Sequence, residues 1–215
     1  MSGIGEVLTS FPHGPHTFGG GMVSPKSEVS DHMLTNKMTK NASDAFEAAK
    51  TIWNDVALHR HPDRENNGKI REALKLFDEA IDSGYDSSEV YSLRGACLNE
   101  LGFYYDALED YNRAMQRNPE KGIASNYHMR SVVKDSLLDL DGSVSDLKEA
   151  VRLSKMSNAD TRFWNDYAKK TGFGSATEFY EWCLQGAERS LAYEKTSPTS
   201  DADKKAKLET IRRRT

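Results

Sequence analysis

The chain has 215 residues, of which 37% are hydrophobic and 29% charged, and its formal net charge is -4. This composition is typical of a soluble protein with a sizeable core, and no apolar run approaches the roughly eighteen residues that a membrane span requires. Cys97 and Cys183 lie far apart, outside any CxxC or Cys/His cluster, so they indicate neither a disulfide framework nor a zinc site. The net acidity argues against a general affinity for nucleic acid.

Residues 1–40 are expected to form an amino-terminal arm. They contain glycine and proline clusters, show no helical period, and carry positive and negative charges that cancel. They show neither the apolar core of a secretion signal nor any arginine of the kind enriched in mitochondrial transit peptides. We therefore expect a cytoplasmic location, with an organellar or ciliary one left open.

Helical patterns begin at Asn41, a good capping residue for a helix whose apolar residues Phe46, Ala49, Trp53 and Val56 recur at spacings of three and four. Glycines, prolines and a Ser175-x-x-Glu178 capping box delimit the helices that follow. These are expected at about residues 69–83, 88–101, 104–117, 123–140, 142–154, 159–171 and 175–193. No convincing strand pattern occurs, so the chain is predicted to be all-α.

The second helix of each expected pair repeats one signature: a small residue, a large apolar residue four positions later, and a small residue three positions after that. Its starts are 34, 36 and 33 residues apart. The four copies are Ala73, Phe77, Ala80; Ala107, Tyr111, Ala114; Ser143, Leu147, Ala150; and Ala176, Tyr180, Cys183. Small residues allow close helix approach, so the chain is predicted to be an array of helical hairpins.

The first helices of the middle pairs repeat as well. Tyr91-x-x-Arg94-Gly95 is followed 36 residues later by Tyr127-x-x-Arg130-Ser131. Asp110 and Asp146 keep the same interval, and each lies 16 residues after its arginine, across the turn of one hairpin. We therefore predict an Arg94–Asp110 and an Arg130–Asp146 salt bridge, each contributing about 0–1 kcal/mol if exposed.

These motifs resemble the tetratricopeptide repeat, clearly over about residues 44–155 and weakly over 158–194. The resemblance implies an all-α right-handed superhelical solenoid of about four hairpins over residues 41–195, with a degenerate capping hairpin at the carboxyl end. The residues that carry the repeat signature are Ala73, Phe77, Ala80, Tyr91, Arg94, Gly95, Ala107, Asp110, Tyr111, Ala114, Pro119, Tyr127, Arg130, Asp146, Leu147 and Ala150. Its implied function is a non-enzymatic adaptor or scaffold for protein binding and complex assembly.

The resemblance also implies a concave groove formed by the first helices of the hairpins. The predicted groove residues are Glu89, Ser92, Ala96, Asn99, Ser125, His128, Val132 and Asp135. Only Asn99 among them is a plausible donor, while Glu89 and Asp135 are acidic, so the predicted partner is a basic or neutral protein segment. The alternative is that these residues form only a solvated face.

Aromatic residues gather in the final hairpin, at positions Phe163, Trp164, Tyr167, Phe173, Phe179 and Trp182. They are expected to cover the open end of the core, as terminal repeats do. An aromatic binding cage is the alternative.

Residues 196–215 form a basic tail on an acidic body. The tail is expected to be a frayed end, to fold back on the body, or to bind an acidic partner. A second hypothesis for the function follows: a structural subunit of a larger assembly, tethered by residues 1–40 and by this tail.

A third hypothesis is a J-like co-chaperone, because His61-Pro62-Asp63 stands in a loop between two helices. No catalytic triad, phosphate-binding loop or dinucleotide fingerprint occurs, so neither an enzyme nor a cofactor is expected. A calcium loop at Asp139, Asp141 and Gly142 would place Lys148 where the bidentate glutamate belongs, so no metal site is expected.

Overall fold

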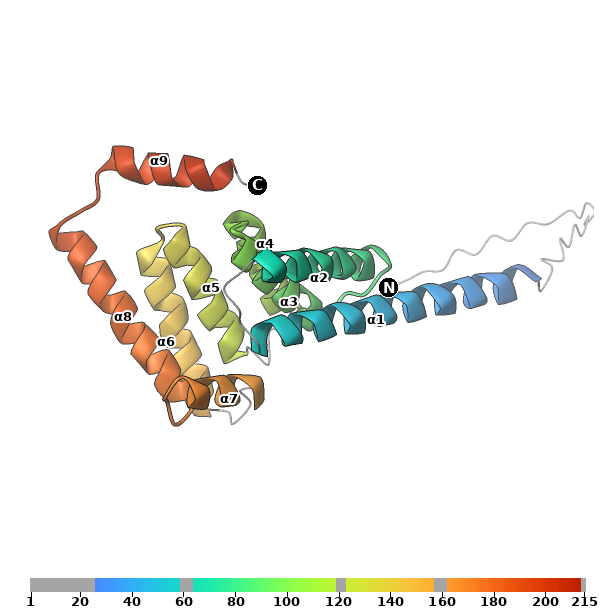
Figure 1. The fold of residues 1–215 in the computed structure, drawn as a ribbon. Helices are drawn as coiled ribbons and strands as arrows, with labels where there is room; N and C mark the ends of the chain where they lie inside the picture. The colour runs from blue at the N-terminus through green and yellow to red at the C-terminus, as the bar shows by residue number, and fades with distance from the viewer. Residues whose placement is uncertain (1–25, 59–63, 119–122, 157–161, 214–215) are drawn as a thin grey trace, which may run out of the picture. The chain divides into compact units, whose positions relative to one another are not determined.

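The computed structural model describes residues 26–58, 64–118, 123–156 and 162–213, in which the regular elements are all helices (Figure 1). The helices are α1 Lys26–Leu58, α2 Arg64–Asp82, α3 Ser88–Leu101, α4 Tyr104–Arg117, α5 Ala124–Ser136, α6 Leu140–Met156, α7 Arg162–Lys170, α8 Ala176–Thr196 and α9 Asp201–Arg212. The all-α prediction is confirmed for this part of the chain.

The chain divides into two compact units, residues 1–35 and residues 36–215. Of the first unit the structure describes residues 26–35, which are helical. The prediction that a helix begins at Asn41 is wrong, because α1 begins at Lys26 and runs through this position without interruption. Asparagine caps a helix only where the preceding backbone is extended, and here the preceding residues already make helical hydrogen bonds.

The repeat signature marks the buried contact between paired helices. Ala73, Phe77 and Ala80 of α2 pack in one apolar cluster with Phe46 and Val56 of α1. Ala107 and Tyr111 of α4 are equally buried, as are Leu147 and Ala150 of α6. The small residues allow this approach, and the predicted hairpin array is confirmed over α1–α6. Pro119, the signature's closing proline, lies outside the described residues.

Gly95 shows how close the helices come. A Cβ atom at this position would lie 3.3 Å from Cβ of Asp110 and 3.3 Å from Cζ of Tyr111. Because few real Cβ contacts are so short, a side chain here would push α3 away from α4. Glycine therefore fixes the α3–α4 distance in this hairpin.

The turns within the hairpins use left-handed backbone at equivalent places. Gly102 between α3 and α4 has φ 83°, and Gly172 between α7 and α8 has φ 94°. Leu138 takes the same position between α5 and α6, with φ 65°. This conformation ends α5 at Ser136, so the prediction that this helix continues to residue 140 is wrong. The Asp139 side chain accepts a hydrogen bond from Gly142 N at 2.9 Å, which starts α6 two residues before the predicted position.

The last hairpin is packed differently from the others. The longer helix, α8, packs directly along α6, whereas α7 has only nine residues and packs mainly on α8 (Figure 1). In a regular array the first helix of a hairpin would contact the preceding hairpin. Here the second helix takes that role, so the array ends in an altered cap.

The basic tail folds back on the body. Its residues Asp201–Arg212 form α9, which Ser200 caps by accepting a hydrogen bond from Asp203 N. Ile211 is only 7% exposed, and the Arg212 guanidinium lies 5.5 Å from the centroid of the Tyr105 ring on α4. Of the expectations for the tail, folding back on the body is therefore the one that these residues show, and a frayed end is not.

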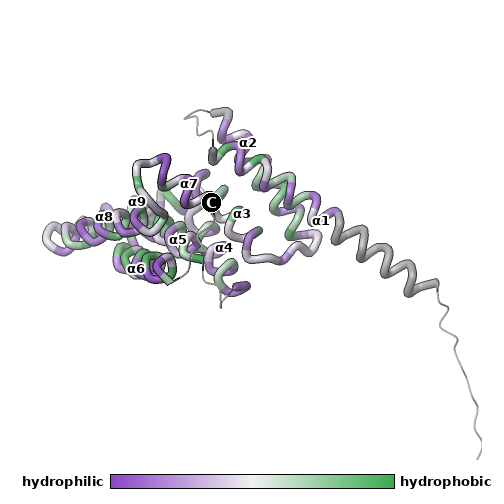
Figure 2. Tube along the Cα trace, turned by 90° about the horizontal axis from the view of Figure 1, so that it is seen from below, coloured by the Kyte–Doolittle hydropathy of each residue, from purple (hydrophilic) through white to green (hydrophobic). Residues whose placement is uncertain are grey.

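Most helices of the array contain both hydrophobic and hydrophilic residues along their length (Figure 2), as expected for helices with one buried face. No helix within the described ranges is both long enough and apolar enough to cross a lipid bilayer.

Candidate protein-interaction surface

Arg94 and Asp110 join α3 to α4 through a buried ion pair. Nε and Nη2 of Arg94 each donate to a carboxylate oxygen of Asp110 at 2.7 Å. The Asp110 side chain is only 2% exposed, so this pair is not of the exposed kind for which little stability is expected. Arg94 also donates to Asp78 on α2 at 2.9 Å, and the hydrogen bonds to Asp110 raise the pKa of its guanidinium.

Arg130 and Asp146 repeat the arrangement in the next hairpin. Both donor–acceptor distances are again 2.7 Å, and Lys134 adds a second cation 2.9 Å from the same carboxylate. Arg130 also donates to Asn112 on α4. Both salt bridges predicted from the 16-residue spacing are therefore confirmed, and each arginine also contacts the preceding hairpin. This fixes the relative register of α2–α6, which carry the surface described next.

Five predicted groove residues retain exposed atoms on α3 and α5. We call this set the α3/α5 surface, and its members are Glu89, Ser92, Asn99, Val132 and Asp135. Spacings of three and seven place the residues of each helix on one face. The two helices are joined where Ser92 Oγ donates to Asn126 Oδ1 at 2.9 Å.

The charges of this surface differ at its two ends. Glu89 is paired with Lys50 of α1 at 2.7 Å, and this hydrogen bond raises the pKa of Lys50. Asp135 is exposed, and no cation of the described residues lies within ion-pair distance of it. Val132, which is 39% exposed, lies one turn before Asp135. The α5 end therefore combines an apolar side chain with an unpaired carboxylate.

Asn99 lies on the same face with an unsatisfied acceptor. Its Oδ1 is buried and has no hydrogen-bond partner among the described residues. A buried amide oxygen left unpaired costs about 1–3 kcal/mol. Because this oxygen is covered, only the exposed part of the Asn99 side chain is open to a partner.

The other three predicted groove residues are buried, which corrects the prediction for them. Ala96 and Ser125 are covered by neighbouring helices, and His128 is only 6% exposed. The sequence spacing places all three on the expected helix faces, but the altered last hairpin packs over the His128 side of α5. They offer no open surface to a partner segment.

His128 lies inside an aromatic cluster formed by α7 and α8. Its ring centroid is 5.2 Å from those of Trp164 and Phe179 and 5.1 Å from that of Tyr180. Burial lowers the pKa of His128 to about 4, so the imidazole is neutral near pH 7. Nε2 meets the Cys183 sulfur at 3.8 Å, while Nδ1 has no partner within the described part of the chain.

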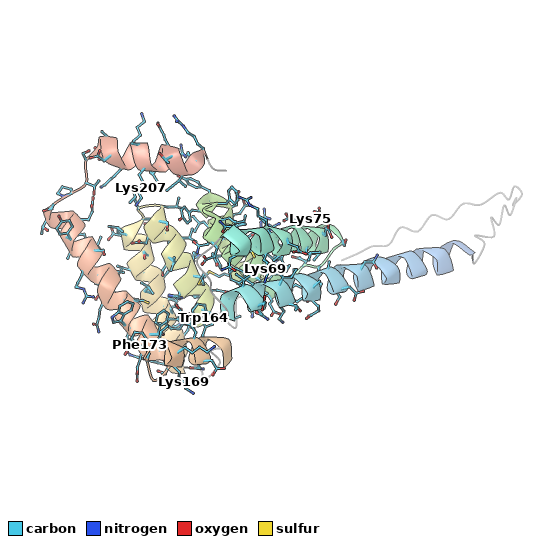
Figure 3. The ribbon with its side chains drawn as sticks, viewed as in Figure 1. Lys69, Lys75, Trp164, Lys169, Phe173 and Lys207 are labelled. Atoms are coloured by element: carbon cyan, nitrogen blue, oxygen red, sulfur yellow. The ribbon has the colours of Figure 1, made fainter. Side chains whose placement is uncertain are left out.

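The aromatic residues of the last hairpin serve mainly as core, as expected. Phe179 is buried, and Trp164, Tyr167 and Phe173 pack against the same cluster; the Phe163 side chain lies outside what the structure describes. Figure 3 shows Trp164 and Phe173 near the junction of α7 and α8. Trp182 is 57% exposed, with its ring 5.7 Å from that of Phe173. The sequence does not predict that His128 is buried among these rings, because that contact depends on how α8 packs on the array.

Of the two remaining sequence motifs, only the one at Asp139, Asp141 and Gly142 lies within the described residues. His61-Pro62-Asp63 lies outside the described residues. No group of three or more potential metal-ligating side chains is close enough to hold a metal ion in the described ranges. Asp139, part of the rejected calcium motif, instead caps α6 through Gly142 N.

Comparison with known proteins gives one sequence relative of interest. No protein-family model matches the chain. The heat shock protein STI1 of Saccharomyces cerevisiae is 33% identical over 88 residues, which are 40% of this chain and 15% of that protein. The chain therefore matches about 15% of the length of this curated relative.

Solved structures extend the likeness over most of the chain. PcrH, crystallised in complex with the chaperone binding region of PopD, matches with a TM-score of 0.52 and 18% identity, over 69% of this chain and 95% of that one. The Sgt2 TPR domain of Aspergillus fumigatus matches with a TM-score of 0.50 and 14% identity, over 73% of this chain and 86% of that one. At such identities the likeness concerns the fold: this chain has the fold of a tetratricopeptide-repeat domain.

Proposed function

We propose that the chain is a non-enzymatic adaptor that binds a segment of a partner protein on the α3/α5 surface. The observation that carries this proposal is that exposed Val132 and Asp135 lie one turn apart on α5, beside the partly exposed Asn99 of the adjoining α3. These groups offer an apolar contact, a negative charge and a polar side chain. The fold supports the proposal, because PcrH, a structure of like fold, was crystallised in complex with a region of PopD.

The partner segment is expected to be basic or neutral. Asp135 attracts a cation, and Glu89 can exchange its contact with Lys50 for one with the partner, since both side chains are partly exposed. An acidic segment would meet two carboxylates and find no free cation on the α3/α5 surface. The chemistry of this surface therefore selects by charge.

The contacts of α9 with the body favour the α3/α5 surface over the basic tail as the principal binding site. Lys204 of α9 is paired with Glu194 at 2.7 Å, and Ile211 is buried. Both contacts tie the basic tail to the body of this chain. The α3/α5 surface, with its exposed Asp135, has no such internal occupant among the described residues.

Site-specific cross-linking tests the proposal. A photoreactive phenylalanine at position 132 of the full chain, irradiated in native extract, is expected to capture a protein through a basic or neutral segment. The matched control carries the same group at Glu72, which is exposed on α2. Capture of the same proteins from both positions would contradict a specific site, as would consistent capture of acidic segments.

A further inference from the structure

A hollow lies next to the α5 end of the α3/α5 surface, where the α5–α6 turn meets the end of α8 and the start of α9. Leu138 N, in its lining, donates to Asp135 O at 2.9 Å. The volume of the hollow is about 200 Å³, and Leu138, Leu140 and Leu191 contribute its apolar lining. This is less than the roughly 300–1,000 Å³ that pockets for drug-sized molecules enclose. The hollow is thus of a size to hold one side chain.

Leu138 is retained in this lining at a conformational cost. Its φ of 65° is in the left-handed region, where the equivalent turns of the other two hairpins have Gly102 and Gly172. A non-glycine residue in this region costs on the order of 1–3 kcal/mol. A glycine would avoid that cost but would remove one of the three leucines from the hollow. Leucine at this position therefore supplies apolar surface to the hollow that glycine would not.

The charged residues at the hollow leave one carboxylate without a cation. Glu194 is already engaged, since it pairs with Lys204 at 2.7 Å and accepts a hydrogen bond from Thr199 Oγ1 at 2.8 Å. Lys195 lies 3.6 Å from Asp141, near the outer limit for an ion pair.

Asp139 supplies the surplus charge. Its Oδ1 caps α6 through Gly142 N, and no cation of the described residues lies within ion-pair distance of its carboxylate. Asp139 and Asp141 together therefore present more negative charge than Lys195 can neutralise. This surplus favours a cationic ligand over an anionic one.

We infer that this hollow receives a single arginine side chain from a partner protein. An arginine has an aliphatic stem that can pack on the three leucines and a planar guanidinium that can pair with Asp139 or Asp141. The volume matches one long side chain, and the lining combines the two kinds of surface that an arginine carries. The residues that line the hollow are different from the members of the α3/α5 surface.

The experiment uses capped tripeptides and the full chain. Acetyl-Ala-Arg-Ala-amide is titrated while the methyl resonances of Leu140 and Leu191 are followed by NMR. The arginine peptide is expected to shift both residues saturably, with a dissociation constant on the order of millimolar, as for a single side chain. The matched peptide with citrulline, which has the same shape without the charge, is expected to bind at least tenfold more weakly.

Two variants separate binding from folding. Asp139→Asn/Asp141→Asn keeps an oxygen for the α6 cap and is expected to weaken binding at least tenfold, unlike the control Glu72→Gln/Asp82→Asn on α2. Leu138→Gly removes the strained residue, so it is expected to remain folded and to lose binding. Equal shifts from the two peptides, undiminished binding by the Asn variant or by Leu138→Gly, or preferential binding of a glutamate peptide would each overturn the inference.

Discussion

Nε and Nη2 of Arg94 hold both carboxylate oxygens of Asp110 at 2.7 Å, in a hairpin contact where the aspartate side chain is 2% exposed. Removing one member of a buried pair leaves the other charge unsatisfied and costs about 3–5 kcal/mol. Arg94→Met is therefore expected to lower the free energy of unfolding by about 3–5 kcal/mol in urea denaturation.

The double variant Arg94→Met/Asp110→Leu provides the control for that prediction. It removes both charges and fills the site with apolar groups, so its loss is expected to be smaller than that of Arg94→Met alone. A double variant that loses the sum of the two single effects would show that the residues do not act as a pair.

Tyr111 carries a buried hydroxyl without a hydrogen-bond partner among the described residues. Tyr111→Phe removes this unsatisfied group and keeps the ring, so thermal unfolding is expected to show a gain of about 1 kcal/mol. The matched variant Tyr91→Phe removes a hydroxyl that is hydrogen-bonded to Asp86, and a loss of about 0.5–1.5 kcal/mol is expected. Equal effects of the two variants would contradict this difference between the hydroxyls.

His128 predicts a specific dependence of stability on pH. Its pKa is about 4 in the folded chain, below the roughly 6.5 of an unfolded histidine, so the unfolded chain binds more protons between these values. The folded state is therefore expected to lose up to about 3 kcal/mol as the pH falls from about 6.5 to 4.

The variant His128→Leu isolates that contribution from those of other titrating groups. The difference in free energy of unfolding between the two proteins, measured at several pH values, should be flat above pH 7 and should change below about pH 6.5. A difference that stays constant down to pH 4 would mean that the buried imidazole does not control this dependence.

Replacement of two glycines by alanine is expected to change stability in opposite directions. Gly102 has φ 83°, so Gly102→Ala forces a side chain into the left-handed region and is expected to destabilise by about 1 kcal/mol or more. Gly186 lies inside α8, and a Cβ added there would meet no neighbouring atom within 4 Å, so Gly186→Ala is expected to stabilise by about 0.5–1 kcal/mol. Thermal unfolding of both variants checks the pair, and a shared sign would contradict it.

The regular part of the fold could be predicted from sequence because its contacts repeat. The alanines and large apolar residues of α2, α4 and α6 recur near 35 residues apart, and the Arg94–Asp110 spacing recurs in Arg130–Asp146. Such repetition specifies neighbouring hairpins, since each repeat contacts the next in the same way.

The features of the fold that the sequence did not predict each occur once, so no repeated pattern indicates them. The packing of α8 on α6, which buries His128, depends on non-local contacts of the last hairpin that no other hairpin shares. The end of α5 before the left-handed Leu138 could not be predicted because glycine, the usual sequence signal for such an end, is absent there. The helix over Asp201–Arg212 was missed because its charges favour solvent and only Ile211 is buried. The cytoplasmic location inferred from the amino-terminal sequence stays a prediction.

The charge of the α3/α5 surface is what selects the partner segment in the proposed function. The decisive measurement is the affinity of the full chain, of Glu89→Lys/Asp135→Lys and of Glu72→Lys/Asp82→Lys for the segment captured from position 132. Both double variants change the net charge by the same amount, but the second pair lies on α2. A loss of at least tenfold with the first variant alone is predicted. Unchanged affinity in the first variant, or equal losses in both, would contradict the α3/α5 surface as the binding site.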